Sequence, residues 1–255
     1  LKEATMKNEI INDLLGFEGL KIIQHPDIFN FSLDSTLLAS FVSVNLKDKK
    51  IIDLGTGNAP IPLFLSMRTN AEIIGVEIQP EIAEIAKKSV TLNNLENRIT
   101  IINDDAIGIY KKLGVSQFDL VTCNPPYFKI KEDSNINKND YLSIARHEIK
   151  MNLDSLLQEA NRLLKDGGTF AMVHRSARLI DILISFRKWG IEPKRIRFVY
   201  PKKTSEDSLI LLIEGKKSKK TGDLKILKPL YIHNKNNEYT KEVKDIFNYN
   251  KPMKK

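Results

Sequence analysis

Short apolar runs rich in β-branched residues alternate along this chain with segments whose apolar positions recur at the period of a helix. That alternation predicts an α/β domain with helices packed on a mainly parallel sheet. Helices are expected from about Leu153 to Lys165, from Pro80 onward, and from near Ser176 to Trp189. The seven runs expected to form strands are Ile51–Leu54, Glu72–Glu77, Ile99–Asn103, Phe118–Cys123, Gly168–His174, Lys194–Tyr200 and Leu209–Glu214.

The regions before and after these strands are expected to belong to the same domain, which would span 1–255. In the N-terminal region, a helix is expected near Ser35 to Val44, with Asp34 or Ser35 as its cap. The three expected parts are a helical cover of the cofactor cleft at 1–50, the sheet core at 51–215 and a basic C-terminal extension at 216–255.

Composition excludes several classes of protein. The single cysteine, Cys123, rules out an internal disulfide and reads as a small apolar residue at the end of a strand. The four histidines lack metal-ligand spacing, so no metal site is expected. No run approaches the length of about 18 apolar residues that crosses a bilayer, and the first residues lack a secretion signal's apolar core. We therefore expect a soluble, cytoplasmic monomer that binds no membrane.

The net charge of +8 and the pI near 9.3 favour a polyanionic partner such as nucleic acid. The chain is also rich in Lys, Asn and Ile together, a bias that an AT-rich genome would produce without selection for binding. Charge alone leaves both readings open.

A glycine-rich turn follows the first predicted sheet strand, in the segment Asp53-Leu54-Gly55-Thr56-Gly57. Glycines let the backbone approach a ligand closely, and the helix that follows would offer unpaired amides to a carboxylate or phosphate. Glu77 ends the second strand, where its carboxylate can accept hydrogen bonds from ribose hydroxyls. These features suit a nicotinamide dinucleotide or S-adenosylmethionine, but Pro60 stands where the dinucleotide motif needs its third glycine.

Two aspartates, Asp104 and Asp105, follow the third strand at the edge of the sheet where ligands bind in open α/β folds. We expect Asp105 to accept a hydrogen bond from the adenine amino group of the cofactor. The alternative is that either aspartate only caps the following helix.

The segment Asn124-Pro125-Pro126-Tyr127 leaves the fourth strand at the same edge. Two consecutive prolines hold the backbone extended and stiff. We hypothesise that the Asn124 side-chain oxygen and the Pro125 carbonyl accept both hydrogens of a planar amino group, which turns the nitrogen lone pair out of the ring. Tyr127 would stack on the substrate ring. The alternative is an ordinary turn after a strand, and the polar segment Lys129–Asn139 that follows predicts a loop.

With these motifs in this order, the chain resembles the class I S-adenosylmethionine methyltransferases of the adenine-N6 and glutamine-N5 type. The resemblance covers most of Ile51 to Gly215 and implies a Rossmann-like α/β fold, with a seven-stranded mixed sheet that has one antiparallel strand and helices on both faces. It also implies that Asp53, Gly55, Gly57 and Glu77 bind the cofactor, together with Asn124.

A narrower resemblance lies in the segment from Ile23 to Ala39, which is similar to the opening of the bacterial tRNA1(Val) adenine-37 N6-methyltransferase family. The segments Ala145-Arg146-His147-Glu148 and Tyr200-Pro201 are also similar to that family. This resemblance implies a tRNA partner and N6-methyladenosine beside the anticodon, with Asn124, Pro125, Pro126 and Tyr127 as the catalytic motif.

Basic residues after that motif are candidates for contact with the RNA phosphates, namely Arg146, Lys202 and Lys203; solvated surface positions are the alternative. Rival functions remain. A protein glutamine-N5 methyltransferase acting on a release factor would use the same motif, as would a DNA adenine-N6 methyltransferase. A catalytically silent RNA-binding module or a nicotinamide-dependent oxidoreductase could use the same sheet.

Overall fold

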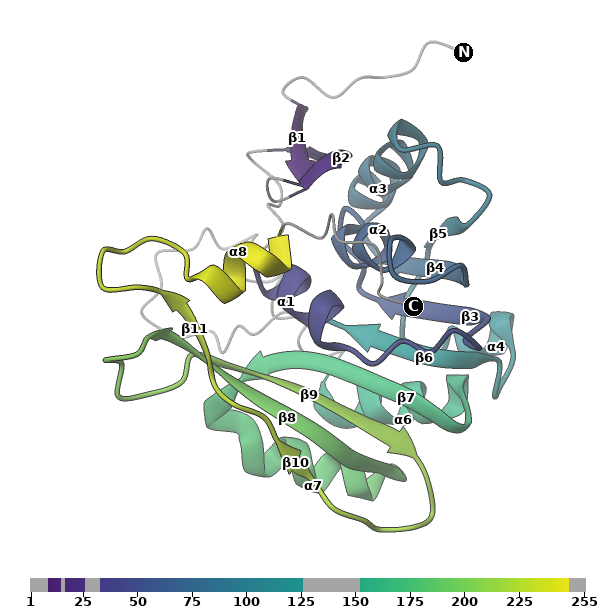
Figure 1. Ribbon diagram of the computed structural model, residues 1–255. Coiled ribbons are helices and arrows are strands. Elements are labelled where there is room, and N and C mark those ends of the chain that lie inside the picture. Colours follow the sequence, from purple (N-terminus) through teal and green to yellow (C-terminus); the bar gives the residue numbers. More distant parts are fainter. Residues whose placement is uncertain (1–8, 15–16, 26–32, 126–151, 248–255) are drawn as a thin grey trace, which may run out of the picture.

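The computed structural model describes residues 9–14, 17–25, 33–125 and 152–247 (Figure 1). Its centre is a twisted sheet with helices packed on both faces, as the sequence predicted. The seven expected strands are all present: β3 (Lys50–Leu54), β4 (Glu72–Glu77), β5 (Ile99–Asn103), β6 (Phe118–Cys123), β7 (Leu164–Arg175), β8 (Ile191–Lys202) and β9 (Ile210–Lys217). The last three are longer than predicted.

The direction of the strands follows the expected mixed pattern. Strands β5, β4, β3, β6 and β7 lie side by side in that order and are parallel, while β9 is antiparallel to both β7 and β8. Because β9 reverses direction, β8 runs parallel to β7, and the carboxyl ends of β6, β7 and β8 all meet one edge of the sheet.

The sheet has nine strands in the described part of the chain, so the expected count of seven was wrong. The two further strands, β10 (Lys225–Ile226) and β11 (Leu230–His233), both pair with β8 in parallel and come from the region predicted as a basic extension. They are too short to show a strand pattern, and both residues of β10 are exposed. Their pairing depends on the outer edge of β8, which sequence alone does not reveal.

Two helical layers cover the sheet, each over its own apolar core (Figure 1). On one face lie α1 (Leu33–Phe41), α2 (Pro60–Ser66), α3 (Pro80–Leu92) and α8 (Lys241–Phe247). On the other face lie α4 (Tyr110–Leu113), α6 (Leu153–Leu163) and α7 (Leu179–Lys188), the last preceded by a 3₁₀ turn at Ser176–Arg178. The helices predicted from apolar periodicity are thus confirmed.

Two predicted helix ends were wrong. Helix α1 begins at Leu33, so Asp34 and Ser35 lie inside its first turn and do not cap it. Helix α6 ends at Leu163 because Leu164 already has extended backbone angles and starts β7. Leucine is compatible with either state, so the boundary is set by pairing of Leu164 with Phe118 of β6.

The N-terminal part is not the purely helical cover that the sequence predicted. A hairpin of β1 (Ile10–Leu14) and β2 (Phe17–Gln24) precedes α1. The side chain of Asn93, just after α3, pairs with the backbone of Lys21 twice: Oδ1 accepts from its amide at 2.8 Å and Nδ2 donates to its carbonyl at 2.7 Å. Most of β1 is exposed, so it lacks the alternation that marks a strand.

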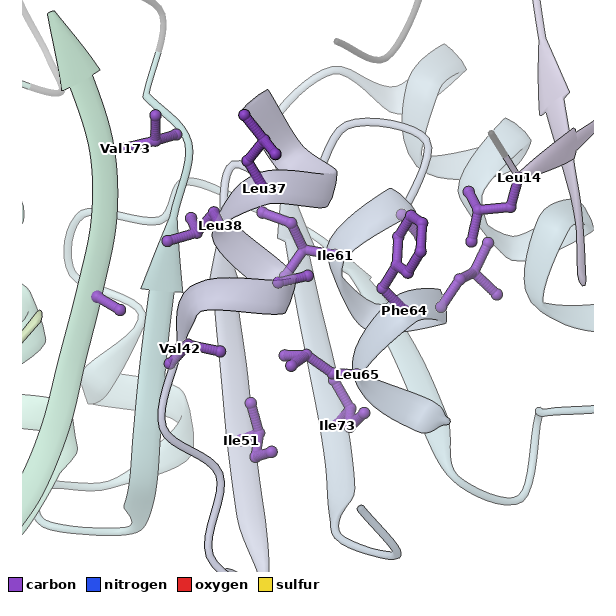
Figure 2. Packing of buried hydrophobic residues seen from close by; sticks show 14 of the residues in the cluster. Leu14, Leu37, Leu38, Val42, Ile51, Ile61, Phe64, Leu65, Ile73 and Val173 are labelled. Carbon is purple, nitrogen blue, oxygen red and sulfur yellow. The ribbon is translucent and has the colours of Figure 1, made fainter. Parts of the chain in front are cut away.

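Helices α1 and α2 pack together over the middle of the sheet (Figure 2). Leu37 and Leu38 of α1 lie against Ile61 of α2, and Val42 and Leu65 continue this layer above β3 and β4. Full burial of a side chain of this size stabilises the fold by about 1.5–3 kcal/mol. The contact fixes α1 beside the carboxyl edge of the sheet. No helix in the described ranges is long and apolar enough to cross a membrane.

Candidate active site

Four of the predicted site residues converge on the carboxyl edge of the parallel strands. Asp53 lies near the end of β3, Glu77 ends β4, Asp105 follows β5, and Asn124 follows β6. The order β5-β4-β3-β6 brings these ends side by side (Figure 1). This is the edge at which open α/β sheets bind ligands.

The glycine-rich turn after β3 reverses the chain tightly beside β4. Gly55 and Gly57 have φ angles of 69° and 58°, which favour glycine because a Cβ atom is strained there. The amides of Gly55 and Thr56 both donate to the carbonyl of Val76 at 2.9 Å. Ala59 also has a positive φ of 71°, a strained position that the sequence did not predict.

The helix after this turn does not offer the row of amides that we expected from the sequence. Two of the first three residues of α2, Pro60 and Pro62, have no amide hydrogen, and the amide of Leu63 already donates to the carbonyl of Ala59. This end of α2 is therefore a poor site for a pyrophosphate. That favours a ligand without a phosphate chain.

Glu77 joins the turn to the end of β4. Its Oε2 accepts a hydrogen bond from the amide of Gly57 at 3.0 Å, and its Oε1 accepts one from the amide of Gln79 at 2.9 Å. The side chain is almost fully buried. Glu77 therefore holds the glycine turn against the end of β4.

Asp53 is a fully buried carboxylate with an incomplete set of partners. Its Oδ1 accepts a hydrogen bond from the Thr122 hydroxyl at 2.7 Å, while Oδ2 has no hydrogen-bond partner in the described residues. Burial raises the pKa of Asp53 to about 7, the hydroxyl groups of Thr122 and Thr56 oppose this rise, and the nearby Glu77 charge adds to it. A ligand that brings positive charge to Asp53 would stabilise its ionised form.

Asp105 makes a local contact in the turn before α4, but it does not cap that helix, whose N-cap residue is Ile109 and has no side-chain cap. Its Oδ1 accepts from the amide of Ile107 at 2.9 Å, while its own amide donates to Asp104 Oδ1 at 2.8 Å. Asp104 also forms an ion pair with Lys112. Asp105 lies at the carboxyl edge of the sheet, where the cofactor is expected, but its Oδ1 stabilises the turn that follows β5.

Asn124 leaves β6 with its side chain directed at α1. Its Nδ2 donates a hydrogen bond to Ser35 Oγ at 3.0 Å. Pro125 follows and is buried. The remaining residues of the motif, Pro126 and Tyr127, lie outside the described part of the chain, as do the predicted loop Lys129–Asn139 and Arg146.

Lys202 ends β8, and Lys203 follows it, so both lie at the same edge of the sheet as Asn124. Strands β7 and β9 separate β8 from β6, which corresponds to about 14 Å across three strand spacings. The structure therefore does not bring these lysines to the amide of Asn124.

Several residues of this site were missed by sequence reasoning. Thr122 and Ser35 contact Asp53 and Asn124, and Asn58 donates from Nδ2 to the carbonyl of Ile23, which joins the turn to the N-terminal hairpin. These contacts join segments distant in the sequence. Gly75 could have been noticed, because a glycine inside a strand often marks a close approach.

Gly75→Ala is expected to disturb the turn. A Cβ atom at Gly75 would lie 2.9 Å from Thr56 Oγ1, Thr56 Cγ2 and Ile101 Cδ1, so the glycine-rich turn and the Ile101 side chain on β5 would both have to shift. We expect a loss of about 1–3 kcal/mol in the free energy of unfolding and weaker binding of the cofactor. Urea denaturation and calorimetry would measure both.

Gly222→Ala is the matched control for this substitution. The new Cβ would meet only the end of the flexible Lys194 side chain, which can move aside. Its stability should stay within about 0.5 kcal/mol of the unsubstituted protein. Equal behaviour of the two variants would show that the approach of Thr56 to β4 imposes no constraint.

Metal and thiol chemistry find no support in the described residues. They contain no group of three His, Cys, Asp or Glu side chains that could hold a metal ion. Cys123 is fully buried, and burial raises the pKa of its thiol well above the ordinary value, which keeps it protonated. It packs as part of the apolar core between the sheet and α6.

Known proteins are similar to this chain in sequence and in fold. A tRNA1(Val) (adenine(37)-N6)-methyltransferase of Cytophaga hutchinsonii is 25% identical over 193 residues, covering 76% of this chain and 79% of that protein. A Methanocaldococcus jannaschii relative named for protein N5-glutamine methyltransferase activity is 29% identical over 166 residues, covering 64% and 80%. A solved structure, a predicted O-methyltransferase from Agrobacterium tumefaciens, is 22% identical with a TM-score of 0.65, covering 84% and 95%.

The family match covers the sheet and the site together. A family described as a methyltransferase domain matches residues 45–245, which include every strand from β3 to β11. This range contains the glycine-rich turn, Asp53, Glu77 and Asn124. Because the match spans well over half of the sequence, the chain belongs to this methyltransferase-domain family.

Proposed function

We propose that this protein transfers a methyl group from S-adenosylmethionine to the N6 atom of an adenine in tRNA, with adenine 37 of tRNA1(Val) as its target. The observation that supports this most is the position of Asn124 and Pro125, which leave β6 at the edge formed by Asp53, the glycine turn and Glu77. The relative from Cytophaga hutchinsonii carries the name of this activity.

The residues at this edge fit S-adenosylmethionine. The Oδ2 atom of Asp53 is buried without a partner among the described residues, which suits a cationic ligand. Glu77 would accept hydrogen bonds from the ribose hydroxyls, and Gly55 and Gly57 leave room for close approach of the backbone. Asp105 remains our candidate for the adenine amino group. When bound, the cofactor supplies a methyl group activated by a positively charged sulfur.

The residues that would bind the methyl-accepting amino group also activate it, because such a group is a poor nucleophile. The exocyclic nitrogen of adenine delocalises its lone pair into the ring. Asn124 Oδ1 and the Pro125 carbonyl would accept its two hydrogens, which holds the nitrogen in place and turns its lone pair out of the ring plane. The nitrogen loses a proton as it becomes charged, so this chemistry needs neither a metal ion nor a strong base.

The remainder of the motif would hold the adenine and its RNA. Tyr127 would stack on the base once it has left its neighbours, a contact that contributes about 1–3 kcal/mol per base. Arg146, Lys202 and Lys203 would contact phosphates of the same tRNA. We expect a monomer without a metal ion, working in the cytoplasm, where tRNA is found.

Methylation of a glutamine side chain is the second candidate function. The Methanocaldococcus jannaschii relative favours it, because its name refers to the N5 atom of glutamine. A glutamine amide presents the same planar NH₂ group to Asn124 and Pro125, so the motif alone does not separate the two substrates.

The test is incubation of the protein with S-adenosylmethionine labelled in its methyl group and with unmodified tRNA, followed by digestion and analysis of nucleosides. The expected product is N6-methyladenosine at position 37 of tRNA1(Val). Parallel reactions contain a peptide release factor or duplex DNA as the only acceptor. Labelling of the release factor or the DNA, with none in tRNA, would overturn the proposal.

A further inference from the structure

Helix α1 supports the side chain of Asn124. Ser35, in the first turn of α1, accepts a hydrogen bond through its Oγ from Asn124 Nδ2 at 3.0 Å. The two residues are 89 positions apart in the sequence. Ser35 is only 5% exposed, so water does not compete freely for its hydroxyl group.

The direction of this hydrogen bond has chemical meaning. A carboxamide has a donor end and an acceptor end of nearly the same shape, and rotation about its last bond exchanges them. With Nδ2 at the Ser35 hydroxyl, Oδ1 is the end of the carboxamide that does not bind Ser35. The proposed reaction requires this acceptor end, because an amino group presents only hydrogens.

Contacts on several sides hold helix α1 in place, so the position of the Ser35 hydroxyl group is well defined. Leu37 and Leu38 are buried against α2 and the sheet (Figure 2). Just beyond the helix, Ser43 donates to the buried carboxylate of Glu214 on β9, from its amide at 2.8 Å and from its hydroxyl at 2.7 Å. Arg195 of β8 pairs with the same carboxylate at 3.0 Å.

We propose that Ser35 is a positioning residue for methyl transfer: its hydroxyl holds Nδ2 of Asn124, so that Oδ1 of Asn124 faces the acceptor amino group. This inference rests on the proposed function of Asn124. Ser35 acts through Asn124 and contacts neither substrate, so its removal changes the rate of the reaction and leaves the affinity for S-adenosylmethionine unchanged.

Ser35→Ala removes this hydrogen bond and the restraint that it places on the orientation of the amide. We expect kcat to fall about tenfold, with an unchanged Kd for S-adenosylhomocysteine and an unchanged KM for tRNA. Ser35→Thr keeps a hydroxyl and should retain a rate within about threefold of the parent, provided that thermal unfolding shows an intact fold.

The neighbouring residue provides a matched control. Thr36 lies in the same turn of α1, is fully buried, and has a hydroxyl without a hydrogen-bond partner in the described part of the chain. Thr36→Val removes that hydroxyl while keeping the shape of the side chain. It should leave kcat unchanged, so that a loss specific to Ser35→Ala cannot come from general loosening of α1.

A double-mutant cycle in kcat decides the question, using Ser35→Ala, Asn124→Ala and the double variant. If Ser35 acts through Asn124, Ser35→Ala has no further effect once Asn124 is alanine. Additive losses, or full activity of Ser35→Ala beside an inactive Asn124→Ala, would overturn the inference alone. Failure of the unsubstituted protein to methylate any tRNA would instead overturn the proposed function.

Discussion

Asn124→Ala is expected to lower the rate of methyl transfer to tRNA by about 10²–10³-fold, as removal of one preorganised polar group does in other active sites. The substitution removes the side-chain oxygen that would accept a hydrogen from the target amino group. Cofactor affinity should change little, because Asp53 and Glu77 lie on other strands. Single-turnover kinetics with labelled S-adenosylmethionine would measure the rate, and calorimetry with S-adenosylhomocysteine the affinity.

Two further asparagine variants test whether the loss of rate is specific to the side chain of Asn124. Asn124→Asp keeps acceptor oxygens but loses the donor to Ser35 Oγ, so its rate should lie between those of the alanine variant and the parent. Asn236→Ala changes an exposed loop residue and should have no effect on the rate. A fully active Asn124→Ala variant would remove Asn124 from the mechanism.

The second large effect concerns Asp53 and pH. Because burial raises the pKa of Asp53 to about 7, protonation and cofactor binding should compete. In the proposed site the cationic cofactor would favour the ionised carboxylate, whose fraction falls about tenfold for each pH unit below 7. The Kd for S-adenosylmethionine should therefore rise steeply from pH 7.5 to 5.5. Calorimetry in buffers of different ionisation enthalpy would also detect the released proton.

Asp53→Asn is the control for this titration. The amide keeps the shape of the side chain but has no charge to lose, so the affinity should be low and nearly independent of pH over the same range. An equally flat profile in the parent protein would mean that Asp53 does not respond to the charge of the ligand.

The stability of the ligand-free protein should change in the opposite direction. The folded state keeps the proton of Asp53 up to a pH of about 7, whereas the unfolded chain releases it near the ordinary aspartate pKa of 3.8. This contribution is complete below the unfolded pKa and is lost as pH rises through the folded one. Relative to Asp53→Asn, the parent should lose about 2–3 kcal/mol between pH 5 and pH 8 in urea denaturation.

The elements of the fold were predictable because their signals are local. Apolar runs of β-branched residues marked β3 to β9, and helical periodicity marked α3, α6 and α7. The weak elements were missed for the same reason. The exposed strand β1 and the two-residue β10 carry no hydrophobic pattern of their own and form by pairing with β2 and β8.

The sequence by itself determined the order in which the site residues follow one another along the chain. The glycine turn comes first, then Glu77, then the Asn124 motif, each at the end of a strand. Only the tertiary structure decided the partners of these groups. Thr122 meets Asp53 through strand register, and Ser35 meets Asn124 because α1 packs beside the carboxyl edge. Hydrophobic period and turn chemistry act over a few residues, whereas hydrogen bonds between distant segments depend on how sheet and helices pack.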